Sequence, residues 1–89
     1  MPRAGLRIAE EFSDALAEIY SDRILSRLEQ AVSNLADFPE VGSPRVRRCL
    51  SERYGEGLRQ VPVSTFLIVY RYDGQTVDVL ALVYGPRVS

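Results

Sequence analysis

Three arginines and one tyrosine in the second half of the chain have the side chains best suited to a functional site. Arg59, Arg71 and Arg87 each lie in or next to an apolar, strand-like run, and Tyr84 precedes the last of them. An arginine among apolar residues is unfavourable unless it meets an anion or lies on an open face. The guanidinium is a planar group of donors that matches carboxylate and phosphate. The sequence therefore predicts an anion-binding surface in this half of the chain.

Proton transfer is harder to assign to these residues. An arginine has a pKa above 12, so presenting it deprotonated at neutral pH costs about 7 kcal/mol. Arg87 is therefore a poor base, and its one remaining catalytic role is to stabilise a phosphorane with its positive charge. Tyr54, Tyr70 and Tyr84 are the possible proton carriers, although their pKa values ordinarily lie near 10 and the alternative is a structural aromatic role. Arg87 and Tyr84 are the candidate catalytic residues.

The absence of histidine excludes several kinds of site. The chain contains no histidine, which rules out a Ser-His-Asp triad and removes the commonest zinc ligand. The single cysteine, Cys49, follows Arg47 and Arg48, and these cations favour its thiolate. No histidine is present to serve as its base, so we expect an inert thiol. The sequence predicts no metal and no cofactor.

Charge is distributed unevenly along the chain. Residues 1–40 hold four arginines against eight acidic residues, a net charge of −4, and residues 41–89 hold seven against four, a net charge of +3. Every basic residue is an arginine. This favours carboxylate or phosphate partners for the second half, with genomic composition bias as the alternative explanation.

Length and composition indicate one small globular domain, residues 1–89. Independent cores need on the order of 100 residues, which leaves no room for a second domain. Apolar residues make up 46% of the chain and charged residues 26%, as in folded proteins. No apolar run approaches the roughly 20 residues of a membrane span, and the start lacks a signal-peptide core. We expect a cytoplasmic protein with no membrane partner.

The first half of the chain predicts a short strand and two helices. The strand falls within residues 4–9. A first helix begins at Glu10, and a second follows the capping residue Ser21 and ends before Pro39. The short connection favours an antiparallel pair over one kinked helix. The apolar stripes are Phe12, Ala15, Leu16, Ile19 and Tyr20 in the first helix, and Ile24, Leu25, Leu28, Ala31, Val32, Leu35 and Phe38 in the second.

The second half predicts a loop followed by strands. Residues 40–44 form the loop, and residues 45–51 alternate in a way that fits a short edge strand or an irregular arm. A turn over residues 54–57 leads to a strand at residues 58–63, where Pro62 indicates an edge position or a bulge.

A hairpin closes the chain around Asp73 and Gly74, because glycine tolerates the positive φ of a tight turn. Both faces of residues 65–72 are largely apolar, which predicts a central strand. Helices cover only one side of such a sheet, so the side that carries Arg71 is predicted to be open for a ligand or partner.

Four local signatures resemble the RelE/ParE superfamily of type II toxins. They are the L-x-x-x-P-x-x-G exit from the second helix at residues 35–42, the Gly-Leu-Arg opening of the meander at 57–59, the central strand at 66–71 followed by Asp-Gly, and the closing segment at 83–87. The resemblance covers about residues 7–87. It implies an α+β fold in which the helical hairpin packs on one face of a mostly antiparallel sheet that ends in a three-stranded meander.

The resemblance also implies a toxin neutralised by a cognate antitoxin, with a homodimer or a heterotetramer as possible assemblies. RelE-type members cut mRNA on the ribosome, and ParE-type members poison DNA gyrase. Leu67 and Pro86 occupy positions where the nucleases carry an arginine and a lysine, and Tyr84 stands where many relatives have histidine. The sequence therefore favours a ParE-like protein that binds its target through Arg59, Arg71, Arg87 and Tyr84. The alternatives are a ribosome-dependent mRNA endonuclease and a degenerate, non-toxic binding module.

Overall fold

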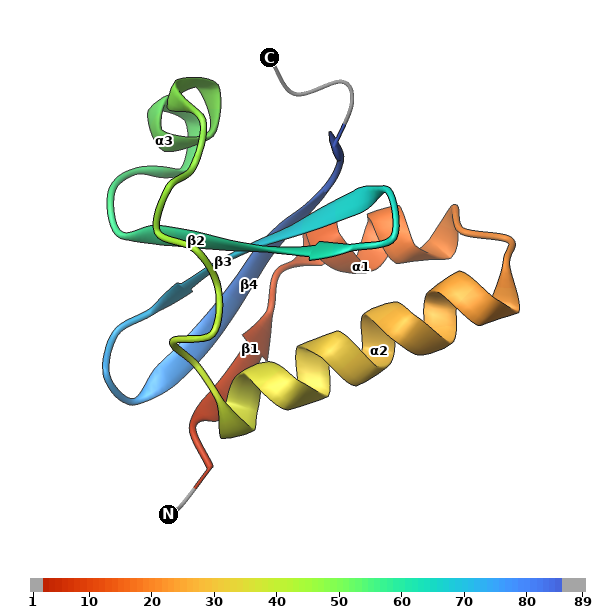
Figure 1. Ribbon diagram of the computed structural model, residues 1–89, viewed down its shortest axis with the longest axis horizontal. Helices are drawn as coiled ribbons and strands as arrows, with labels where there is room; N and C mark the ends of the chain where they lie inside the picture. Colours follow the sequence, from red (N-terminus) through yellow and green to blue (C-terminus); the bar gives the residue numbers. More distant parts are fainter. Residues whose placement is uncertain (1–2, 86–89) are drawn as a thin grey trace.

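The computed structural model describes residues 3–85, which form four strands and three helices (Figure 1). The predicted α+β architecture is confirmed. In chain order the elements are β1 (Gly5–Ile8), α1 (Glu10–Ala17), α2 (Asp22–Asp37), α3 (Arg48–Tyr54), β2 (Leu58–Val63), β3 (Phe66–Tyr72) and β4 (Thr76–Tyr84). Among these residues, no helix is long and apolar enough to cross a membrane.

The four strands form one mixed sheet in the order β1-β4-β3-β2. β1 runs parallel to β4, and the β2–β3 and β3–β4 pairs are antiparallel, so the predicted closing meander is confirmed. β3 is a central strand, and β2 with Pro62 lies at an edge, where a residue without an N–H is tolerated.

α1 and α2 run in opposite directions and cover one face of the sheet (Figure 1). The Ser21 hydroxyl caps α2 by accepting a hydrogen bond from the Ile24 N–H at 3.3 Å, as its position before the helix predicts. The core on this face consists of Phe12, Leu28, Leu35, Ile68, Tyr70, Val77 and Val79.

Two residues assigned to the apolar stripes of the helices are exposed instead. Tyr20 is 93% exposed and Phe38 is 65% exposed. Both follow the last helical residue, since α1 ends at Ala17 and α2 at Asp37, and the chain turns before either side chain can reach the sheet.

The second face of the sheet carries α3, which sequence patterning missed. Of the two alternatives for residues 45–51, the edge strand is wrong, and the irregular arm is found only at residues 45–47, because a helix starts at Arg48. Leu50 and Tyr54 lie four residues apart on one face of α3, and with Val46, just before the helix, they pack with the buried residues Leu58, Val69 and Ala81. The face predicted to be open is therefore covered in part by α3.

A bulge lets β4 contribute to both faces of the sheet. Val69 pairs with Ala81, and the next residue of β3, Tyr70, pairs with Val79, so Leu80 is left without a partner in β3. The extra residue reverses the alternation of β4. Val79 consequently faces α1 and α2, and Ala81 faces α3.

The hairpin turn predicted at Asp73 and Gly74 is confirmed. Gly74 adopts a φ of 99°, and the Asp73 carboxylate accepts hydrogen bonds from the N–H groups of Gln75 at 2.9 Å and Thr76 at 2.7 Å. Hydrogen bonds from Thr76 first and Gln75 second lower the pKa of Asp73. The turn fixes the register of β3 and β4, and with it the direction in which Arg71 points.

Candidate functional site

Arg59 holds the loop that follows α2. One nitrogen of its guanidinium, Nη1, donates to the backbone carbonyls of Glu40 at 3.1 Å and Gly42 at 2.7 Å. A charged donor shared by two carbonyls fixes their relative position more firmly than a neutral donor. The arginine predicted to bind a target is thus engaged within the protein.

The Tyr70 hydroxyl holds the same loop from inside the core. It accepts a hydrogen bond from the Gly42 N–H at 2.8 Å and donates to the Pro39 carbonyl at 2.8 Å, and the Tyr70 side chain is fully buried. A Cβ added to Gly42 would lie 2.6 Å from this hydroxyl, so only glycine fits there. Burial raises the pKa of Tyr70, opposed by the hydrogen bond from Gly42 and the charge of Arg59. Tyr70 therefore serves as an anchor.

Arg71 closes the C-terminal end of α3. Its Nε donates to the Glu56 carbonyl at 3.2 Å, and its Nη2 donates to the Tyr54 carbonyl. Carbonyls at the end of a helix lack intrahelical partners and carry partial negative charge, which a guanidinium neutralises. The chain can leave the helix at this point because Gly55 adopts a φ of 93°.

Of the four residues predicted to bind a target, the three within residues 3–85 do not form one cluster. Arg59 pairs with Tyr70 across the strands, and Arg71 pairs with Leu58. Because Tyr70 belongs to the core under α1 and α2 and Leu58 to the core under α3, the two arginines point to opposite faces of the sheet.

Tyr84 lies at the other end of the sheet from Arg71. It is 41% exposed, and its ring centroid lies 5.8 Å from that of Phe66, its partner across the strands. Arg71 lies five positions after Phe66 in β3, a span of roughly 17 Å. Arg87 and Pro86 lie outside the described residues.

A polar cluster that the sequence did not reveal joins α3 to α1. Arg53 Nη2 lies 3.1 Å from Glu11 Oε1, and the Tyr54 hydroxyl donates to the other oxygen of the same carboxylate. The Arg53 guanidinium also lies 5.3 Å from the centroid of the Tyr54 ring. Burial, the hydrogen bond to Glu11 and its negative charge together raise the pKa of Tyr54 to about 12. Tyr54 is thereby a poor proton carrier near neutral pH.

We expect the stability of the protein to fall above about pH 10 because of Tyr54. Its folded pKa of about 12 exceeds its ordinary value of 10.0, so the folded state holds this proton more tightly than the unfolded state. The resulting stabilisation is complete below pH 10.0 and is lost as the pH rises through about 12. Urea unfolding at several pH values across this interval measures the decline. Tyr54→Phe should show a shallower decline, and equal slopes in the two proteins would contradict the assignment.

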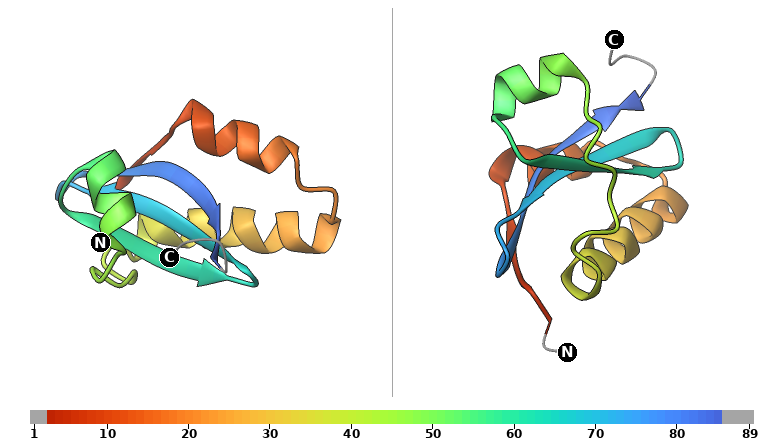
Figure 2. Two further views of the ribbon diagram at one scale, coloured as in Figure 1. Left: turned by 90° about the horizontal axis from the view of Figure 1, so that it is seen from above. Right: turned by 60° about the vertical axis from the view of Figure 1, so that its left-hand side comes forward.

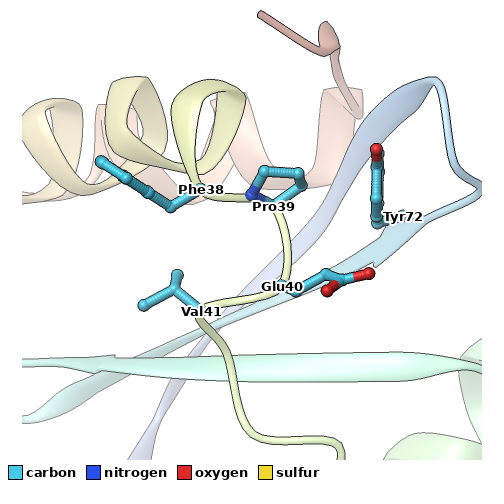
Figure 3. A pocket seen from close by; sticks show the side chains of 5 residues that line it. All are labelled: Phe38, Pro39, Glu40, Val41 and Tyr72. Atoms are coloured by element: carbon cyan, nitrogen blue, oxygen red, sulfur yellow. The ribbon is translucent and has the colours of Figure 1, made fainter. Parts of the chain in front are cut away.

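The loop held by Arg59 and Tyr70 exposes apolar side chains beside a shallow pocket. Figure 3 shows Phe38 and Val41 projecting to one side of the loop, with Glu40 directed toward Tyr72. The pocket, lined by these residues and Pro39, has a volume of about 540 Å³. Phe38 and Val41 are 65% and 63% exposed. Apolar side chains on a rigid loop are suited to contact with a protein partner.

Across residues 3–85 no group of three or more cysteine or carboxylate side chains is placed to hold a metal ion. Cys49 is exposed on α3. The geometry thus consists of internal anchors together with surfaces suited to contact with a macromolecule.

A helical hairpin on one face of a sheet that ends in a meander defines the fold of RelE/ParE superfamily toxins, as the sequence signatures predicted. Residues 6–88 match the family described as ParE toxin of type II toxin-antitoxin system, parDE, and the chain belongs to this family. Among curated proteins none matches the chain significantly in sequence.

Two solved structures share the fold. A chain of the RelBE2 toxin-antitoxin complex from Mycobacterium tuberculosis has a TM-score of 0.73 and 23% sequence identity, covering 94% of this chain and 99% of that one. A chain of the intact E. coli RelBE toxin-antitoxin complex has a TM-score of 0.66 and 12% identity, with 89% and 93% covered. At these identities the likeness concerns the fold alone.

Proposed function

We propose that this protein, a toxin of the RelE/ParE superfamily, acts by binding DNA gyrase and is held inactive by a cognate antitoxin protein. The family match supports a ParE-type action. The complexes that share its fold each pair a toxin with an antitoxin, which supports an antitoxin partner. Such a protein acts in the cytoplasm, where gyrase is found.

The environments of Tyr54 and Tyr70 favour binding over RNA cleavage. Cleavage requires a group that exchanges a proton near neutral pH. The pKa of Tyr54 is raised to about 12, and burial raises that of Tyr70. Leu67, half-buried in β3, occupies the position at which RelE-type nucleases carry an arginine. These features favour a protein that binds its target without cutting RNA.

We assign direct contact with the target to the end of β4. Tyr84 is partly exposed there, and Arg87 follows three residues later in the sequence. Exposed aromatic and arginine side chains often dominate protein interfaces. Arg59 and Arg71 contribute indirectly, because their guanidinium groups fix the 38–41 loop and the end of α3.

The proposal is tested by expression with and without the neighbouring reading frame, and by a supercoiling assay with purified gyrase. We expect growth arrest that the neighbouring gene relieves, and inhibition of supercoiling by the purified chain. Tyr84→Ala should weaken inhibition by about tenfold or more. Tyr20→Ala is the matched control, since Tyr20 is 93% exposed and lies in the turn between α1 and α2.

The alternatives give different outcomes in the same cells. Cleavage of mRNA at fixed codon positions in ribosome profiles would identify a ribosome-dependent endonuclease and reject the gyrase proposal. Induction without growth arrest would identify a non-toxic binding module. If Tyr84→Ala leaves the inhibition of gyrase unchanged, the target does not contact the end of β4.

A further inference from the structure

Arginine side chains are concentrated in the segment that leads into α3. We call residues 45–48 the basic arm. Arg45, Arg47 and Arg48 are all exposed, and none of the ion pairs found within residues 3–85 includes them. Arg59 and Arg71, by contrast, are engaged with backbone carbonyls. The basic arm is therefore a concentration of positive charge available to a partner.

The basic arm is held two residues before its start and at its second residue. Ser43, just before it, exchanges two backbone hydrogen bonds of 2.9 Å with Gln60 of β2. Within it, Val46 is half-buried against the core that contains Leu50. Because the arm is anchored, little conformational entropy is lost when a partner binds.

The arm is extended where it meets α3, which begins at Arg48. Arg47 has extended backbone angles, φ −68° and ψ 149°, and successive side chains of an extended segment point to opposite sides. Since Val46 points into the core, Arg45 and Arg47 point outward, roughly 7 Å apart along the chain. Carboxylates on alternate residues of an extended peptide have the same spacing.

We infer that the basic arm binds an extended acidic peptide segment with carboxylates on alternate residues. Each guanidinium can take one carboxylate through two parallel hydrogen bonds. A hollow of about 290 Å³ beside the arm, lined in part by Pro44, Val46, Leu58 and the acidic Glu56, has room for an intervening uncharged side chain. The inference rests on the proposed function, because the antitoxin of that proposal supplies the acidic segment that binds the arm.

The charge of the whole chain favours a peptide over nucleic acid. Affinity for nucleic acid grows with the number of phosphates neutralised, and the arm offers only three cations. A longer polyanion would meet residues 1–40, whose net charge is −4. α3 and the arm lie away from α2, so a short acidic segment can bind the arm without approaching α2 (Figure 2).

The inference is tested by fluorescence anisotropy with the full chain and a labelled peptide of about ten residues that alternates glutamate with threonine. We expect binding at low ionic strength that Arg45→Glu/Arg47→Glu weakens by about tenfold or more. Arg23→Glu/Arg27→Glu on α2 makes the same charge change at exposed positions and should leave the affinity within about twofold. If the charge reversal unfolds the protein, Arg45→Gln/Arg47→Gln should still weaken binding.

The inference is overturned if the peptide does not bind, or if both charge reversals weaken binding equally. It is also overturned if a single-stranded oligonucleotide of similar length binds more tightly and loses affinity in the Arg45 and Arg47 variant, because the arm would then recognise phosphate in nucleic acid. Failure of the proposed function is distinguishable from failure of this inference, because it is measured in the gyrase assay, where no acidic peptide is present.

Discussion

Replacing Tyr70 with phenylalanine is expected to lower the free energy of unfolding by about 2–4 kcal/mol. The substitution keeps the ring in the core and removes only the hydroxyl. The Gly42 N–H and the Pro39 carbonyl, each 2.8 Å from that hydroxyl, then lose their partner at a buried site. A buried polar group without a partner costs about 1–3 kcal/mol, and here two are affected. Urea unfolding followed by circular dichroism measures the change.

Tyr72→Phe is the matched control for this substitution. The Tyr72 hydroxyl donates to the Gly74 carbonyl at 3.0 Å at an exposed position, where water replaces the lost donor. We expect a loss of about 0.5 kcal/mol or less. Similar losses in the two variants would show that the Tyr70 hydroxyl does not hold the 38–41 loop.

The strands and the first two helices could be predicted because their signals are local. Ser21 caps α2 through its own hydroxyl, and the Asp73 carboxylate bonds to backbone N–H groups two and three residues away. Such local contacts can be predicted from the spacing of the residues in the sequence. α3 has only seven residues, which is too short for an isolated helix to be stable, and it depends on packing of Leu50 against the sheet.

The candidate site could be predicted only in part, because its partners are distant or belong to the backbone. The sequence marks the arginines at positions 59 and 71 as unusual, but the carbonyls they bind depend on where the loop and α3 fold. Their placement on opposite faces follows from strand register. Glu11 and Tyr54 are 43 residues apart and meet only because α3 packs near the start of α1.

Several residues that carry the likeness to the superfamily bond to one another. Pro39 and Gly42 bind the Tyr70 hydroxyl, and Gly42 also binds Arg59. Together they fix the exit from α2 against the central strand. These signatures therefore report the fold, and differences in target are expected among exposed residues such as Tyr84 and those of the basic arm.

Replacing Arg71 with methionine is expected to lower the free energy of unfolding by about 1–3 kcal/mol and to loosen α3. Methionine retains an unbranched apolar chain of similar length but removes the donors to the Tyr54 and Glu56 carbonyls. The end of α3 then loses the cation that offsets its partial negative charge. Hydrogen exchange should show faster exchange of the amides of α3, and urea unfolding measures the loss of stability.

Arg23→Met is the matched control, since Arg23 is exposed on α2 and none of the ion pairs found within residues 3–85 includes it. We expect it to change stability by about 0.5 kcal/mol or less, because substitutions at exposed positions without such contacts have small effects. Arg71→Lys should fall between the two, since it keeps the charge but loses the planar pair of donors. If Arg71→Met left α3 protected and the protein stable while toxicity disappeared, Arg71 would contact the target directly, as the sequence predicted, and its hydrogen bonds to α3 would be secondary.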